Sequence, residues 1–138
     1  MKSRAYTRAL LSAVGTAALA AAVLAGSQSR SPAAAASSDD VARGAYLVGG
    51  AGQCSDCHGA KLTGGPNFVP APPGNVPWAK AVPQIAGLPM FANDADAVTF
   101  LTTGNLPGGK QALGPMPQYR FNQADATAIV AYLRSIKP

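Results

Sequence analysis

The feature that most constrains this chain is the five-residue run Cys54-Ser55-Asp56-Cys57-His58, which contains both cysteines and the single histidine. On one helical turn, two thiols three residues apart lie on the same side, and an imidazole follows directly. A Cys-x-x-Cys-His run is the attachment signature of a c-type haem, whose vinyl groups bond to the thiols while the imidazole binds iron. The run predicts one covalent haem on Cys54 and Cys57, with His58 as the proximal iron ligand.

Two other kinds of site use cysteines at this spacing. A thioredoxin-type redox pair reacts through a low-pKa thiolate and is expected where strands alternate with helices, a pattern this sequence does not show. A structural zinc ion needs four ligands, and the run supplies at most three. The haem interpretation is therefore favoured over both.

The N-terminal sequence predicts export. Lys2, Arg4 and Arg8 precede an uncharged run from Ala9 to Ala25, whose last residues match a signal-peptidase site. We predict that residues 1–25 are a cleaved signal peptide. An uncleaved membrane anchor is the alternative, because the apolar run is at the short limit for a membrane span.

The rest of the chain divides into a linker and one domain. Residues 26–38 are rich in Ala and Ser and predict a flexible linker, and residues 39–138 predict a single folded domain. Export predicts a periplasmic location, either free or tethered through the N-terminus. Loss of three basic residues with the signal peptide leaves 8 basic against 6 acidic residues, so the formal charge falls from +5 to +2. Such a balance gives no indication of nucleic-acid binding.

Three helices are predicted in this domain. Asp39 or Asp40 is expected to cap a helix over about 41–50, and Asn93 one over about 94–103 that Gly104 ends. A third is expected from residue 123 to about 136, capped by Asn122.

Apolar side chains at helical spacing indicate how these helices pack. The last helix has the clearest apolar face, formed by Ile129, Tyr132, Leu133 and Ile136, and is the expected partner of the first. We expect Tyr46 to widen the packed face of the first helix. The prediction is an all-α domain.

Between the motif and the second predicted helix lies a proline-rich stretch, Gly59–Ala92. Its apolar residues recur at neither helical nor strand spacing. An irregular loop of this length is unusual in a compact domain. A large rigid ligand resolves the difficulty, because the loop can wrap around a haem and use it as part of the core.

The second axial ligand is predicted to be a methionine. Bis-histidine ligation within the chain is excluded by the single histidine, and loss of the signal peptide leaves only Met90 and Met116. Met90, among apolar neighbours, has the pattern of a core residue. Prolines on both sides of Met116 restrict its backbone and favour a fixed side-chain position. Met116 is the predicted distal ligand, with Met90 as the runner-up.

The chain resembles the class I c-type cytochromes, particularly bacterial monohaem domains that serve periplasmic or membrane-bound dehydrogenases and oxidases. The matching segments are RGAYLV before CSDCHG, FLTTG, and MPQYRFNQADATAIVAYLRSI. The resemblance implies an all-α fold of three to four helices around one haem, with the N- and C-terminal helices crossing beside it. It also implies that Met116, in the Met-Pro element, is the distal ligand.

The proline-rich stretch departs from the family pattern and leaves some contacts open. Pro66 and Pro70 are candidates for the carbonyl that accepts a hydrogen bond from the second ring nitrogen of His58. Trp78, Tyr119 and Arg120 are candidates for hydrogen bonds to the haem propionates, with ordinary packing or solvation as the alternative for each.

The predicted function is electron transfer by a monohaem cytochrome c that is not itself an enzyme, with a dehydrogenase or oxidase and the membrane respiratory chain as partners. A haem-based gas sensor, with Met116 displaced, is the alternative. A peroxidase is disfavoured because the chain lacks a second histidine and any glutamate. Lys61, Lys80 and Lys110 are candidates for steering an acidic partner, or are scattered solubilising charges.

Overall fold

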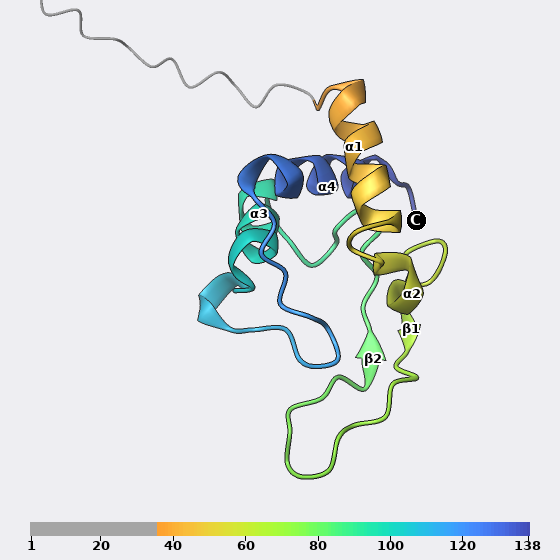
Figure 1. The fold of residues 1–138 in the computed structure, drawn as a ribbon, viewed down its shortest axis with the longest axis vertical. Coiled ribbons are helices and arrows are strands. Elements are labelled where there is room, and N and C mark those ends of the chain that lie inside the picture. Colours follow the sequence, from red (N-terminus) through yellow and green to blue (C-terminus); the bar gives the residue numbers. More distant parts are fainter. Residues whose placement is uncertain (1–35) are drawn as a thin grey trace, which may run out of the picture. The chain divides into compact units, whose positions relative to one another are not determined.

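Four helices dominate the computed structural model, which describes residues 36–138 (Figure 1). The predicted signal peptide and residues 26–35 of the predicted linker lie outside this part. The elements in chain order are α1 (Ser38–Gly49), α2 (Cys54–His58), β1 (Gly65–Pro66), β2 (Ala81–Val82), α3 (Asp94–Thr103), a 3-10 turn (Pro107–Gly109) and α4 (Gln123–Ser135). The predicted all-α fold is confirmed.

Helix α1 begins a few residues earlier than predicted. The Ser37 hydroxyl accepts a hydrogen bond from the Asp40 amide (3.0 Å), and the Asp40 carboxylate accepts one from the Ser37 amide (3.2 Å). This reciprocal pair is a capping box, in which the acid follows the cap by three residues. The prediction that Asp39 or Asp40 is the cap is therefore wrong, because Ser37 is the cap and its hydroxyl accepts from the amide of the third helical residue, Asp40.

Helices α1 and α4 pack across each other, as predicted (Figure 1). Gly44 lies at the crossing, where a methyl group would overlap the Ala128 carbonyl oxygen and lie 2.6 Å from Cβ of Tyr132. The packed face of α1 continues through Leu47 and Val48, which are buried. Tyr46 is 74% exposed, so its assignment to this face is wrong.

Helix α3 packs against α4 and completes the helical core. Both helices have the predicted asparagine caps, since Asn93 Oδ1 accepts from the Asp96 amide and Asn122 Oδ1 accepts from the Asp125 amide, each at 2.9 Å. The buried core joins apolar residues of α1, α3 and α4 to Leu62, after α2, and to three residues of the segment 86–91 before α3. Its members are Leu47, Val48, Leu62, Ala86, Leu88, Phe91, Ala97, Val98, Leu101, Ala126, Ile129, Val130 and Leu133.

The proline-rich stretch is more ordered than its sequence suggests. Strands β1 and β2 pair antiparallel, with Gly65 opposite Val82. The side-chain amide of Asn67 donates to the Ala79 carbonyl (2.7 Å), and its backbone amide donates to the Lys80 carbonyl (3.3 Å). These bonds close the base of a loop that extends away from the helices in Figure 1. Among residues 36–138, none of the helices combines the length and apolar character that crossing a membrane requires.

Candidate functional site

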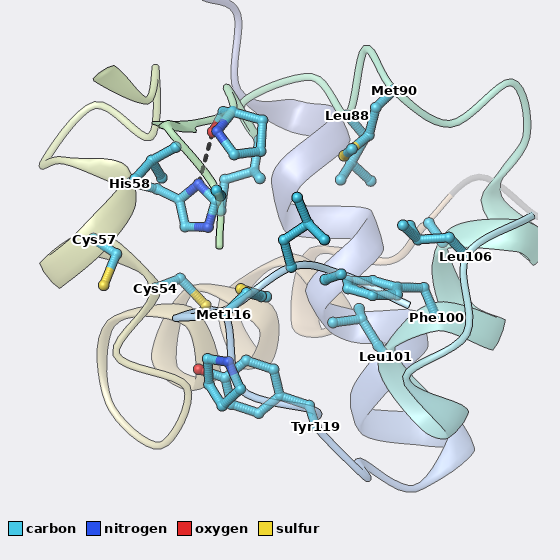
Figure 2. Close-up of a pocket in the computed structure, with 18 of the residues that line it drawn as sticks. Cys54, Cys57, His58, Leu88, Met90, Phe100, Leu101, Leu106, Met116 and Tyr119 are labelled. Atoms are coloured by element: carbon cyan, nitrogen blue, oxygen red, sulfur yellow. Dashed lines mark hydrogen bonds between the residues drawn. The ribbon is translucent and has the colours of Figure 1, made fainter. Parts of the chain in front are cut away.

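A cavity of about 380 Å³ lies between α2, β2, the segment before α3, and the segment from the 3-10 turn to α4 (Figure 2). Its lining is almost entirely apolar and includes side chains from the segment before α3, from α3, from the residue before the 3-10 turn and from α4: Ile85, Leu88, Phe91, Phe100, Leu101, Leu106, Ile129 and Leu133. Cys54, Cys57, His58 and Met116 also line it. The cavity therefore brings together all the predicted haem-binding residues.

Helix α2 places the motif on one turn at the edge of this cavity (Figure 2). The Cys54 side chain is partly buried and that of Cys57 is exposed, and the two do not form a disulfide with each other. Burial raises the pKa of the Cys54 thiol, with smaller contributions from the charges of Cys57 and Asp56. The described residues contain no group of three histidine, cysteine or acidic side chains arranged to hold a metal ion, so the zinc interpretation gains no support.

His58 is 4% exposed and is oriented by a backbone carbonyl. Its Nδ1 lies 2.7 Å from the carbonyl oxygen of Pro83, and the dashed line in Figure 2 marks this bond. A carbonyl only accepts, so Nδ1 carries the proton and Nε2 keeps its lone pair for a metal. The expectation that Pro66 or Pro70 provides the carbonyl is wrong. Pro66 lies in β1, and the carbonyl that reaches His58 is that of Pro83, directly after the partner strand β2.

Both candidate methionines line the cavity, from different segments (Figure 2). Met116 is partly buried, and its amide donates to the Leu113 carbonyl at 3.3 Å. Met90 is 50% exposed at the cavity, so the expectation that it fills the core is wrong. The Phe91 amide donates to the Leu88 carbonyl (3.1 Å), so Pro89 and Met90 lie in the middle of a turn, where both are exposed.

The three predicted propionate donors have other partners in the structure. Trp78 Nε1 donates to the Val69 carbonyl (3.0 Å), and Arg120 Nη1 donates to that of Tyr119 (2.7 Å). The Tyr119 hydroxyl donates to the Gly52 carbonyl, and burial raises the pKa of its phenol. Each of these polar groups bonds to a backbone acceptor of the chain itself, and hydrogen bonding of the three side chains to the propionates stays a prediction.

Sequence reasoning missed the role of Arg134, in the last turn of α4. Its guanidinium donates to the carbonyl oxygens of Gly87 (2.8 Å), Leu88 (3.2 Å) and Phe91 (3.0 Å), and to Asp94 Oδ1 (2.8 Å). It therefore fastens the segment that supplies Leu88, Met90 and Phe91 to the cavity wall. In the sequence, an arginine in the last turn of a helix indicates only a favourable interaction with the helix dipole.

The donor set and the cavity fit a c-type haem. Two thiols on one turn lie at the mouth of an apolar cavity large enough for a ligand, and a histidine with a fixed tautomer lies beside them. A thioether is available from a second segment, and histidine with methionine is an axial pair found in cytochromes c.

Comparison with known proteins also indicates a cytochrome c. The sequence model of the family described as Cytochrome c matches residues 41–137. The chain is also 32% identical over 118 residues to the alcohol dehydrogenase (quinone), cytochrome c subunit, of Gluconacetobacter polyoxogenes and to that of Komagataeibacter europaeus. The matched region is 72% of this chain and 25% of each relative, so the chain spans about a quarter of their length.

The family match covers the helices, the Cys-x-x-Cys-His turn and the cavity together, and the motif in this setting implies a covalent haem c. The chain belongs to the cytochrome c family.

Proposed function

We propose that this protein carries single electrons, with one haem c bound to Cys54 and Cys57 and with His58 and Met116 as its axial ligands. The observation that supports this most directly is that one apolar cavity is lined by both cysteines, the oriented His58 and Met116. A haem bound there supplies a one-electron couple between ferrous and ferric iron.

The chain's own residues account for the properties that such a carrier needs. Two covalent links from α2 prevent loss of the group. The Pro83 carbonyl holds the His58 ring in one orientation, which keeps its geometry constant through repeated cycles. The apolar lining excludes water from the cavity, and a second protein ligand keeps small molecules from the iron.

Visible spectra of the exported, purified protein test this proposal. We expect a low-spin reduced spectrum and a weak far-red sulfur-to-iron band in the oxidised protein. Met116→Leu should lose that band, whereas Met90→Leu, which changes the other thioether of the same cavity, should keep it. A high-spin native spectrum that shifts readily with carbon monoxide would instead support the gas-sensor alternative. Loss of the band only in Met90→Leu would assign Met90, and not Met116, as the distal ligand.

The proposed electron donor is a dehydrogenase. The two relatives named above are cytochrome c subunits of quinone alcohol dehydrogenases, which supports this class of partner. The test is stopped-flow reduction of the oxidised protein by a purified quinone-dependent dehydrogenase with its substrate. Reduction no faster than by the substrate alone would argue against this partner.

Steering by surface charge is a further part of the proposal. Lys61, Lys80 and Lys110 are exposed, and within residues 36–138 none of them takes part in an ion pair. An acidic partner attracted by these charges would bind more slowly as salt rises. A bimolecular rate independent of ionic strength would leave the lysines as solubilising charges.

We further propose a periplasmic location, supported by the charged and apolar pattern of residues 1–25. Mass spectrometry of the haem-containing protein from a periplasmic fraction would identify its first residue. Recovery of the full-length chain only from membranes would favour the anchored alternative.

A further inference from the structure

The segment Gly114–Phe121, which contains Met116, has no regular secondary structure and is held by contacts at its two ends. At its start, the Gly114 carbonyl accepts from the Ala79 amide (2.8 Å), and the Trp78 ring lies so close that a methyl group at Gly114 would be 2.5 Å from its Cε3. At its end, the Phe121 amide donates to the Leu101 carbonyl (3.1 Å). Between these ends, the Met116 amide donates to the Leu113 carbonyl (3.3 Å), a contact between near neighbours that does not tie the segment to a distant part of the described chain.

One side chain ties this segment to the haem-attachment region. The Tyr119 hydroxyl donates to the carbonyl of Gly52, two residues before Cys54. In the described part of the chain it is the only side-chain hydrogen bond that joins residues 114–121 to another segment. Tyr119 also lines the cavity and stacks on Phe121, with ring centroids 5.0 Å apart.

The Gly52 end of this contact is rigid. Gly52 is buried, and its amide donates to the Leu47 carbonyl near the end of α1 (2.7 Å). A methyl group at this position would lie 3.1 Å from Cys54 Sγ and 3.7 Å from the Phe121 ring, so glycine permits the close approach of the three groups. The hydroxyl is therefore bonded to a point fixed to both α1 and α2.

We propose that Tyr119 is a positioning residue whose hydroxyl fastens the Met116 segment to the turn preceding Cys54, and so keeps the Met116 thioether at the distal position. This inference rests on the proposed function, because it takes Met116 as the distal ligand. Loss of the hydroxyl should loosen the segment, and an external ligand that competes with Met116 should then bind more tightly.

The test is imidazole binding to the oxidised holoprotein, followed by the loss of the far-red band. Tyr119→Phe removes the hydroxyl and retains the ring that stacks on Phe121. The apparent Kd for imidazole should fall about three- to tenfold, the factor expected for one ordinary hydrogen bond. Tyr132→Phe, which removes a hydroxyl from another partly buried tyrosine at the α1–α4 crossing, should leave the Kd unchanged.

A double variant separates positioning from general weakening of the fold. A Met116→Leu background has no Met116 thioether to displace and no far-red band, so imidazole binding is followed there by the shift of the main visible absorption band. In that background Tyr119→Phe should have no further effect on the imidazole affinity. An equal effect in both backgrounds would overturn the inference, as would a Tyr119→Phe protein that is less stable to guanidinium but binds imidazole as the native protein does.

The outcomes also separate the two proposals. If Met116→Leu loses the far-red band while Tyr119→Phe has native imidazole affinity, the ligand assignment stands and the positioning role is wrong. If Met116→Leu keeps the native spectrum, both the assignment of Met116 and the role of Tyr119 are wrong.

Discussion

The Nδ1 of His58 lies 2.7 Å from the carbonyl oxygen of Pro83, 25 residues further along the chain. Pro83 directly follows β2, so the short β1–β2 ladder fixes the position of its carbonyl and with it the orientation of the imidazole. Gly64, just before β1, has a φ of 74°, and a methyl group there would overlap the Val82 carbonyl oxygen and lie 2.6 Å from the carbonyl carbon of Pro83. The position of Pro83 therefore depends on a glycine at residue 64.

Gly64→Ala should destabilise the holoprotein by about 1–3 kcal/mol, because it combines a disfavoured backbone conformation with a steric clash. Guanidinium unfolding, followed by circular dichroism, measures the change. Gly65→Ala is the matched control, since a methyl group there meets nothing within 4 Å. If the two variants had the same free energy of unfolding, the backbone at Val82 and Pro83 would be able to move away from the added methyl group without loss of stability.

Gly44→Ala should lower the free energy of unfolding by about 1–3 kcal/mol, because the added methyl group overlaps the backbone of α4 at the helix crossing. Gly49→Ala, in the same helix but with open space around it, should raise the free energy of unfolding by about 0.5–1 kcal/mol, because alanine favours the helix more than glycine does. Thermal unfolding of both holoproteins tests this pair. A stabilising effect at both positions would mean that α1 and α4 separate easily.

Arg134→Lys should lower the free energy of unfolding by about 1–3 kcal/mol. A lysine ammonium group cannot donate to the Gly87, Leu88 and Phe91 carbonyls at once as the planar guanidinium does. Asp94→Asn is its control. The Asp94 side chain is 65% exposed, so loss of its ion pair with Arg134 should cost less than about 1 kcal/mol. A larger loss from Asp94→Asn than from Arg134→Lys would assign the effect to the ion pair rather than to the carbonyls.

Asn122→Ala should destabilise the protein by about 1 kcal/mol, because it leaves the Asp125 amide at the start of α4 without its acceptor. Asn122→Asp preserves an acceptor and should retain most of the stability. Chemical denaturation of the two variants compares them directly, and equal losses would indicate that the cap contributes through its amide nitrogen, which donates to Asp125 Oδ2 at 2.9 Å.

Features that depend on neighbours in the chain could be predicted from the sequence. The spacing of Cys54, Cys57 and His58 within one turn, the asparagine caps, and the apolar period of α4 all follow from helix geometry, which acts over a few residues. The pairing of the first and last helices followed from their apolar faces, because such faces must be buried together.

The sequence by itself thus determined the kind of group this chain binds, its attachment residues and the helices that surround it. Only the tertiary structure decided that Pro83 orients His58, that Met90 lines the same cavity as Met116, and that Tyr119 and Arg134 bond to carbonyls 67 and more than 40 residues away. These contacts join loops that have no hydrophobic period, and backbone carbonyls are present at every residue. No local pattern distinguishes one acceptor from another, so the path of the folded chain selects it.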